Sequence, residues 1–179
     1  MPAKRKQKRF TTAQIEEHIR NIQKVIEKHK REKKGEHFTS ITPEVIAKKL
    51  KRVNSPLITS QGWSNTAPGA TFNYTVGIYN PDPAEIDWLF AHVWVGMGNV
   101  DSAIGKSLSY VDTRFGRLTE PAPFGLTLAA GASVILNFAI TVPTEVEKTG
   151  YIGNSYLMQL NWPGVWRYFD SEAFVFAVD

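Results

Sequence analysis

The chain has 179 residues, of which 42% are hydrophobic and 21% charged, a composition that suits one folded domain of ordinary size with an extension. It contains no cysteine, which excludes disulfide bonds, thiolate metal sites and a cysteine nucleophile. The net charge of +4 at pH 7 conceals an uneven distribution along the chain.

The two parts of the chain carry opposite charge. Residues 1–53 hold 16 Lys and Arg against 6 Asp and Glu, whereas residues 54–179 hold 5 against 11. All five tryptophans lie in the second part. Such asymmetry is typical of a basic arm that contacts a partner. We therefore predict a basic arm over residues 1–53 and one domain over residues 54–179.

The arm begins with a segment that is too polar to bury a core. Residues 1–9 carry five positive charges and no negative charge, so we predict disorder over residues 1–10. Thr11 is a suitable N-cap with Gln14 as its capping-box partner, which predicts a helix over residues 12–34. Isoleucines recur along this helix at the spacing of a short coiled coil. This isoleucine stripe, interpreted as a helix association surface, comprises Ile15, Ile19, Ile22 and Ile26.

A second, shorter helix is predicted over residues 43–53, because Thr42 can cap it and Pro43 suits its first position. Cations cluster at its end. With the cations of the N-terminal segment they form the candidate polyanion-binding set, Lys4, Arg5, Lys6, Lys8, Arg9, Lys48, Lys49, Lys51 and Arg52. Such side chains displace counterions from a phosphate backbone. The alternative is a solvated face on helices that pack against the domain or against copies of themselves.

Two further interpretations of the arm stay open. The basic run at the N-terminus would suit a nuclear import signal in a eukaryotic protein. A basic amphipathic helix can also lie on an anionic membrane, although the apolar side of this helix lacks Trp, Phe and Leu.

From Leu57 onward the spacing of hydrophobic residues changes from the period of a helix to a period of two residues, which is that of a β-strand. Thr71–Tyr79, Ser133–Val142 and Tyr156–Trp162 each alternate apolar and polar side chains, and turn residues such as Asn80-Pro81 and Pro163-Gly164 separate the runs. Seven or so strands at this spacing predict an antiparallel β-sandwich. We therefore expect a mainly β protein, an immunoglobulin-like sandwich preceded by a basic helical arm.

Three segments of this region resemble bacterial immunoglobulin-like domains of the CARDB type. Leu126–Pro143 resembles their strand, small-residue turn and long alternating strand, and Phe72–Pro81 is similar to an early strand that ends in Asn and a turn residue. Gly150–Leu160 is similar to the strand that follows. The resemblance covers about residues 66–178 and implies a sandwich fold. Such domains usually have adhesive or accessory roles outside the cell.

Aromatic side chains mark a second candidate surface. In Asp87–Val95 both faces of the expected strand are apolar, with Trp88, Phe90, His92 and Trp94 on one face, so both faces need a cover. Another subunit, the arm or a carbohydrate ligand could supply the second cover. Two further tryptophans flank the Pro163-Gly164 turn. The candidate aromatic interface or platform is Trp88, Phe90, Trp94, Trp162 and Trp166.

The sequence contains no pattern that is typical of a catalytic site. Nucleophile elbows, phosphate loops and dinucleotide fingerprints are absent, and the four histidines lack metal-ligand spacing. Asp82, Glu85 and Asp87 match no calcium loop. We therefore expect a protein that is not an enzyme and that has no cofactor and no metal. No secretory signal or transmembrane segment is evident, which predicts a cytoplasmic protein, with export by another route or a place in a virion left open.

Three functions fit these observations. The first is a structural or assembly protein that forms a homo-oligomer through its sandwich and contacts nucleic acid or another polyanion through its arm. The second is a protein-interaction module that oligomerises through the N-terminal helix. The third is a carbohydrate-binding or adhesive module that uses the exposed tryptophans.

Overall fold

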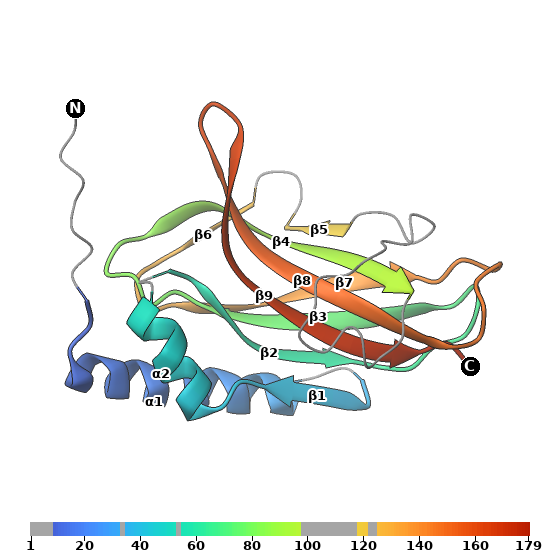
Figure 1. Cartoon of the computed structure of the whole chain (residues 1–179), viewed down its shortest axis with the longest axis horizontal. Coiled ribbons are helices and arrows are strands. Elements are labelled where there is room, and N and C mark those ends of the chain that lie inside the picture. The colour runs from blue at the N-terminus through green and yellow to red at the C-terminus, as the bar shows by residue number, and fades with distance from the viewer. Residues whose placement is uncertain (1–8, 33–34, 53–54, 98–117, 122–124) are drawn as a thin grey trace.

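The structure is a computed structural model, and it describes residues 9–32, 35–52, 55–97, 118–121 and 125–179. Two antiparallel sheets face each other, and two helices lie along one side of the molecule (Figure 1). The predicted mainly β sandwich with a helical arm is thus confirmed. Disorder was predicted over residues 1–10, of which residues 1–8 lie outside the described part of the chain, whereas Phe10 packs against His18 with ring centroids 4.8 Å apart.

The helices of the arm begin where their capping residues predict. Helix α1 covers Thr12–Glu32 and α2 covers Pro43–Arg52. The capping box forms, because Thr11 N donates to Gln14 Oε1 over 2.9 Å and Gln14 N donates to Thr11 Oγ1 over 3.2 Å. Thr42 Oγ1 accepts a hydrogen bond from Val45 N at the start of α2. Local side-chain chemistry therefore sets both N-termini.

The first sheet has the order β1-β2-β3-β7. Its strands are β1 (His37–Ser40), β2 (Leu57–Trp63), β3 (Thr71–Tyr79) and β7 (Ser133–Thr141). Strand β1 comes from the predicted arm, between the two helices, where the sequence analysis expected no strand. It pairs with β2 from His37↔Trp63 to Ser40↔Ser60, so the arm contributes one edge of the sheet.

The second sheet has the order β5-β4-β8-β9, and β6 also pairs with β4. Its strands are β4 (Ile86–Met97), β5 (Leu118–Glu120), β6 (Leu126–Leu128), β8 (Gly150–Asn161) and β9 (Val165–Ala177). The consecutive pair β2-β3 and the later strand β7 lie in one sheet, while β4, β8 and β9 lie in the other. This crossing pattern is that of the immunoglobulin-like sandwich.

The main core fills the space between the sheets with side chains that alternate along each strand. Tyr74 and Phe138 of the first sheet meet Phe174 and Phe176 of the second, and all four are buried. The Tyr74 and Phe174 rings stack with their centroids 4.2 Å apart. Because every second residue of these strands faces inward, the alternation seen in the sequence follows from the pleat of the sheets.

A second core lies between the helices of the arm and the first sheet. Ile22, Ile46 and Leu50 from the helices are buried with Leu57 and Tyr79 from β2 and β3. Both faces of the first sheet are therefore covered at this point, by the second sheet on one side and by α1 and α2 on the other.

Candidate functional site

The isoleucine stripe packs inside the chain. Ile22 is fully buried, Ile15 and Ile26 are 9% exposed, and Ile19 packs against the same cluster. In this structure the stripe therefore faces the first sheet of its own chain, and its association with another helix stays a prediction. Its spacing is that of any helix whose apolar side covers another element, and here that element is the first sheet.

Two histidines of α1 hold the helix on the sheet by hydrogen bonds. His29 is fully buried, with Nδ1 2.7 Å from Ser60 Oγ and Nε2 2.8 Å from Thr75 Oγ1. Burial lowers the pKa of His29 to about 4, and the charge of Glu32 opposes this only in part. His18 Nδ1 lies 2.8 Å from the Tyr79 hydroxyl, and burial lowers its pKa also.

Lys49, a predicted polyanion contact, forms ion pairs inside the chain. Its Nζ lies 2.8 Å from Asp170 Oδ2 and 2.7 Å from Glu172 Oε1, both on β9. Although burial lowers the pKa of Lys49, the two carboxylates raise it above its ordinary value. The charge of Lys49 is therefore compensated within the protein, and its role here is to join α2 to the second sheet.

The other described cations of the candidate polyanion-binding set point to solvent. Arg9, Lys48 and Lys51 are exposed, and none of them forms an ion pair with another described residue. Lys4, Arg5, Lys6 and Lys8 lie outside the described residues, as does the side chain of Arg52.

The outer side of α1 carries a row of cations that the sequence analysis did not single out. Arg20, Lys24, Lys28 and Arg31 are all exposed, at spacings of four, four and three residues. On a helix these spacings place the four side chains opposite the isoleucine stripe. Within the described part of the chain, none of the four forms an ion pair. We call these four residues the cationic row; a helical-wheel plot opposite the isoleucines would have found it.

The aromatic residues of β4 divide between the core and the outer side of the second sheet. Leu89, Ala91, Val93 and Val95 face the main core. Phe90 is buried on the other side, where the Trp166 ring packs edge-on against it with centroids 5.2 Å apart.

Three other aromatic residues of this sheet have separate environments. Trp166 also packs edge-on against His92, with centroids 4.8 Å apart. Trp94 is half-buried and its ring packs against Tyr156. Trp88 leaves the expected alternation, because it has a φ of 56° where the register between β4 and β6 shifts, and it is 49% exposed.

Trp162 is the most exposed large apolar side chain of the described residues, at 96%. It begins the turn between β8 and β9, where Gly164 N donates a hydrogen bond to Asn161 O. Val165 and Tyr168 on the following strand are 61% and 54% exposed. The predicted aromatic residues therefore do not form one platform, and the exposed ones gather mainly on the β8–β9 hairpin.

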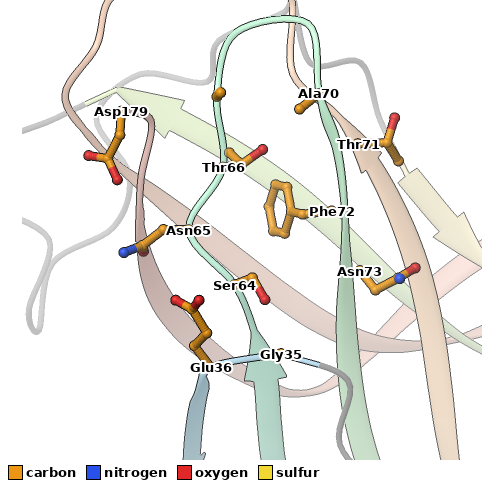
Figure 2. Close-up of a pocket in the computed structure, with 11 residues that line it drawn as sticks. Gly35, Glu36, Ser64, Asn65, Thr66, Ala70, Thr71, Phe72, Asn73 and Asp179 are labelled. Carbon is orange, nitrogen blue, oxygen red and sulfur yellow. The ribbon is translucent and has the colours of Figure 1, made fainter.

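An open polar groove of about 640 Å³ lies beside the end of β2. Figure 2 shows Glu36, Asn65 and Asp179 grouped on one side of it and the Phe72 ring between the strands that border it. Phe72 is only 5% exposed, so it offers little surface for stacking. Among the described residues that line the groove, no nucleophile is paired with a base, and the acidic side chains of Glu36 and Asp179 do not suit a polyanion.

No group of three or more His, Asp or Glu side chains in the described ranges is placed to hold a metal ion. No helix in the described part of the chain has the length and apolar character needed to cross a membrane.

Comparisons with known proteins concern the fold alone. No family's sequence profile matches the chain, and no curated protein sequence matches it. The C-terminal domain of wzt has a TM-score of 0.49 and 7% identity over 64% of this chain and 63% of that one. A CARDB domain from Pyrococcus furiosus, solved with di-metal ions, has a TM-score of 0.41 and 12% identity over 70% and 86%.

The sandwich is also similar to one part of a much larger protein. A β-glucuronidase from Bacteroides uniformis matches with a TM-score of 0.42 and 13% identity, over 66% of this chain but only 12% of its own length. This chain thus spans less than two thirds of the wzt domain and a small part of the glucuronidase. A CARDB domain is among the folds similar to this chain, as the sequence resemblance predicted.

Proposed function

We propose that this protein is a non-enzymatic structural or assembly protein whose basic arm binds nucleic acid or another polyanion and whose sandwich self-associates. The observation that carries the first part is the cationic row, four exposed charges without ion pairs in the described part of the chain. The N-terminal segment adds five positive charges in residues 1–9. A cytoplasmic location stays a prediction.

The geometry of the cationic row suits the backbone of a nucleic acid. Arg20 and Arg31 are 11 residues apart, which is about 16 Å along a helix. Four cations at this spacing can each approach a phosphate, and each contact releases condensed counterions. If all four contribute, the cationic row is expected to account for about −3 to −4 of the slope of log K against log salt concentration.

The way in which α1 is held favours contacts to phosphates over contacts to bases. The helix lies along the first sheet with its apolar side buried, so only its outer side is available. Glu17 and Glu27 also lie on this outer side and repel phosphates, so they lower the affinity without adding any selection among bases. We therefore propose binding that depends on salt and is nearly independent of sequence.

The experiment that tests the proposal compares charge variants of the full chain. Fluorescence anisotropy with a labelled single-stranded DNA and a labelled RNA would be recorded across a salt series. Lys24→Gln/Lys28→Gln removes two cations from the row, and Lys148→Gln is the control because Lys148 is an exposed cation of the sandwich. Point variants are preferable to removal of residues 1–53, which would expose Leu57 and Tyr79 of the second core.

The other two functions have less support. Association through the isoleucine stripe would require α1 to leave the first sheet and to break the contacts of His29 and His18. A carbohydrate-binding platform would need several aromatic rings on one surface, whereas Trp88 is exposed on β4 and the other exposed rings lie on the projecting β8–β9 hairpin.

A further inference from the structure

The β8–β9 hairpin extends beyond the rest of the sandwich. Figure 1 shows the end of β8 and the start of β9 rising from the second sheet as a two-stranded projection. All residues from Trp162 to Tyr168 are exposed, and no charged side chain occurs from Leu160 to Trp166. Packing within the chain does not account for this apolar end, because Trp162 is 96% exposed. An exposed apolar projection of this kind is typical of an interaction surface.

Strand β9 is an edge strand whose outer edge is closed along only part of its length. Towards its end, Gln61 Nε2 donates to Glu172 O and Trp63 Nε1 donates to Val175 O, so side chains of β2 occupy that part of the edge. Among the described residues, the stretch from Val165 to Phe169 has backbone pairing with β8 alone. The open part of the edge therefore coincides with the projecting hairpin. Such an edge is a template for another strand.

A pocket of about 260 Å³ lies at the base of the same hairpin. Its walls are Pro56, Leu57, Tyr168 and Phe169, with the ion pair of Lys49 and Asp170 at one side. Apolar walls beside an ammonium and a carboxylate suit an indole ring, because the ring can stack on the cation and its N–H can donate to the carboxylate.

We propose that a second copy of this chain binds here, with the two β9 edges pairing antiparallel about a two-fold axis at Trp166 and each Trp162 entering the other copy's pocket. This inference rests on the self-association part of the proposed function. In an antiparallel pair centred on Trp166, residues equally distant from the centre are level with each other. Gly164, which directly precedes β9, is then level with Tyr168 of the other copy, a wall of the pocket, and Trp162 lies in the same turn as Gly164.

Three features favour a second copy as the occupant. A two-fold pair uses one surface twice, and this hairpin carries both the projecting tryptophan and the pocket that would receive it. A two-fold axis at Trp166 places the Trp166 side chains of the two copies opposite each other and keeps their two Arg167 side chains apart. An axis at Arg167 would place two like charges opposite each other. Trp, Tyr and Arg also dominate the binding energy of protein interfaces.

The first experiment measures the mass of the full chain by sedimentation equilibrium over a concentration series. We expect a dimer, and we expect Trp162→Ala to raise its dissociation constant at least about tenfold with an unchanged melting temperature. Trp88→Ala removes another half-exposed tryptophan, outside β9, and should leave the dissociation constant within about threefold of the parent. A monomer at all concentrations, or equal losses in both variants, would overturn the proposal.

The second experiment uses the absence of cysteine from the chain. Residues opposite each other in an antiparallel pair have Cα atoms about 4.5–5.5 Å apart, which a disulfide can span. Trp166→Cys should therefore form a covalent dimer under mild oxidation. Ser133→Cys, on the edge strand β7, should stay monomeric on a non-reducing gel. Equal cross-linking of the two variants would contradict the two-fold pairing.

The same variants separate this inference from the proposed polyanion binding. A Trp162→Ala monomer that still binds labelled DNA through the cationic row would support both, because the two surfaces are then independent. If the parent chain is monomeric but binds a glycan array or phosphatidylserine vesicles through Trp162, the second copy is the wrong partner. If Lys24→Gln/Lys28→Gln loses DNA binding, the dimer dissociation constant of this variant still tests self-association separately.

Discussion

His29 Nε2 and Thr75 Oγ1 lie 2.8 Å apart, although His29 belongs to the arm and Thr75 to β3, an inner strand of the first sheet, 46 positions away in the chain. The other ring nitrogen of His29, Nδ1, forms a hydrogen bond with Ser60 Oγ over 2.7 Å. Since His29 is fully buried, this pair of hydrogen bonds links the folding of the arm to that of the first sheet. The link has consequences for stability that can be measured.

Stability should depend on pH through His29. Burial lowers the pKa of His29 from 6.5 to about 4 in the folded chain, so the unfolded chain binds more protons between these values. Stability is therefore full above about pH 6.5 and falls as the pH drops towards 4, by up to about 3 kcal/mol. Urea unfolding at a series of pH values measures this change.

His29→Gln keeps a side chain that can bond to Ser60 and Thr75 but cannot titrate in this range. In that variant the fall in unfolding free energy between pH 6.5 and 4 should become much smaller. His18→Gln is the control, because it leaves His29 in place and should keep most of the fall. A parent chain whose unfolding free energy is constant over this range would show that His29 is not buried as a neutral ring.

The isoleucine stripe should behave as part of the core of a single chain. Ile22 is fully buried, so Ile22→Ala should lower the unfolding free energy by about 2–5 kcal/mol. Lys24→Ala, an exposed change on the same helix, should alter it by less than about 0.5 kcal/mol. Denaturant unfolding at two protein concentrations checks this. If the difference in unfolding free energy between the parent chain and Ile22→Ala disappears on dilution, Ile22 is buried between two copies and not within one chain.

Lys49 should contribute a salt-dependent coupling to the two carboxylates on β9. Its ion pairs with Asp170 and Glu172 are partly exposed, so a double-mutant cycle of Lys49→Met with Asp170→Asn should give about 1 kcal/mol. The coupling should weaken in 1 M salt. Lys48→Met changes the neighbouring exposed lysine and should cost less than about 0.5 kcal/mol. A coupling near zero at low salt would mean that the ion pairs contribute nothing to stability.

Features that depend on neighbouring residues could be predicted from the sequence. The Thr11–Gln14 capping box, the start of α2 at Pro43 and the alternation of β3 and β7 each arise within a few residues. Strand β1 could not be predicted, because four residues with no clear alternation become a strand only when β2 lies beside them.

The partners of the arm were also beyond sequence reasoning. Lys49 meets Asp170, which is 121 positions away, and a basic residue on a helix gives no sign of such a pair. The isoleucine spacing is the same whether the apolar side covers a sheet or another helix, so the pattern alone could not decide between the two. The turn at Trp162 was located correctly, but its exposure follows from how far β8 and β9 extend beyond their neighbours.

Binding of a labelled single-stranded DNA by the full chain across a salt series is the decisive measurement of polyanion binding. We expect a steep loss of affinity with rising salt, and a salt slope that decreases by about 1.4 when Lys24→Gln/Lys28→Gln removes two phosphate contacts. The Lys148→Gln variant should keep the slope of the parent. Equal slopes for the parent and the double variant would show that the cationic row of α1 does not contact the polyanion, and would contradict the account.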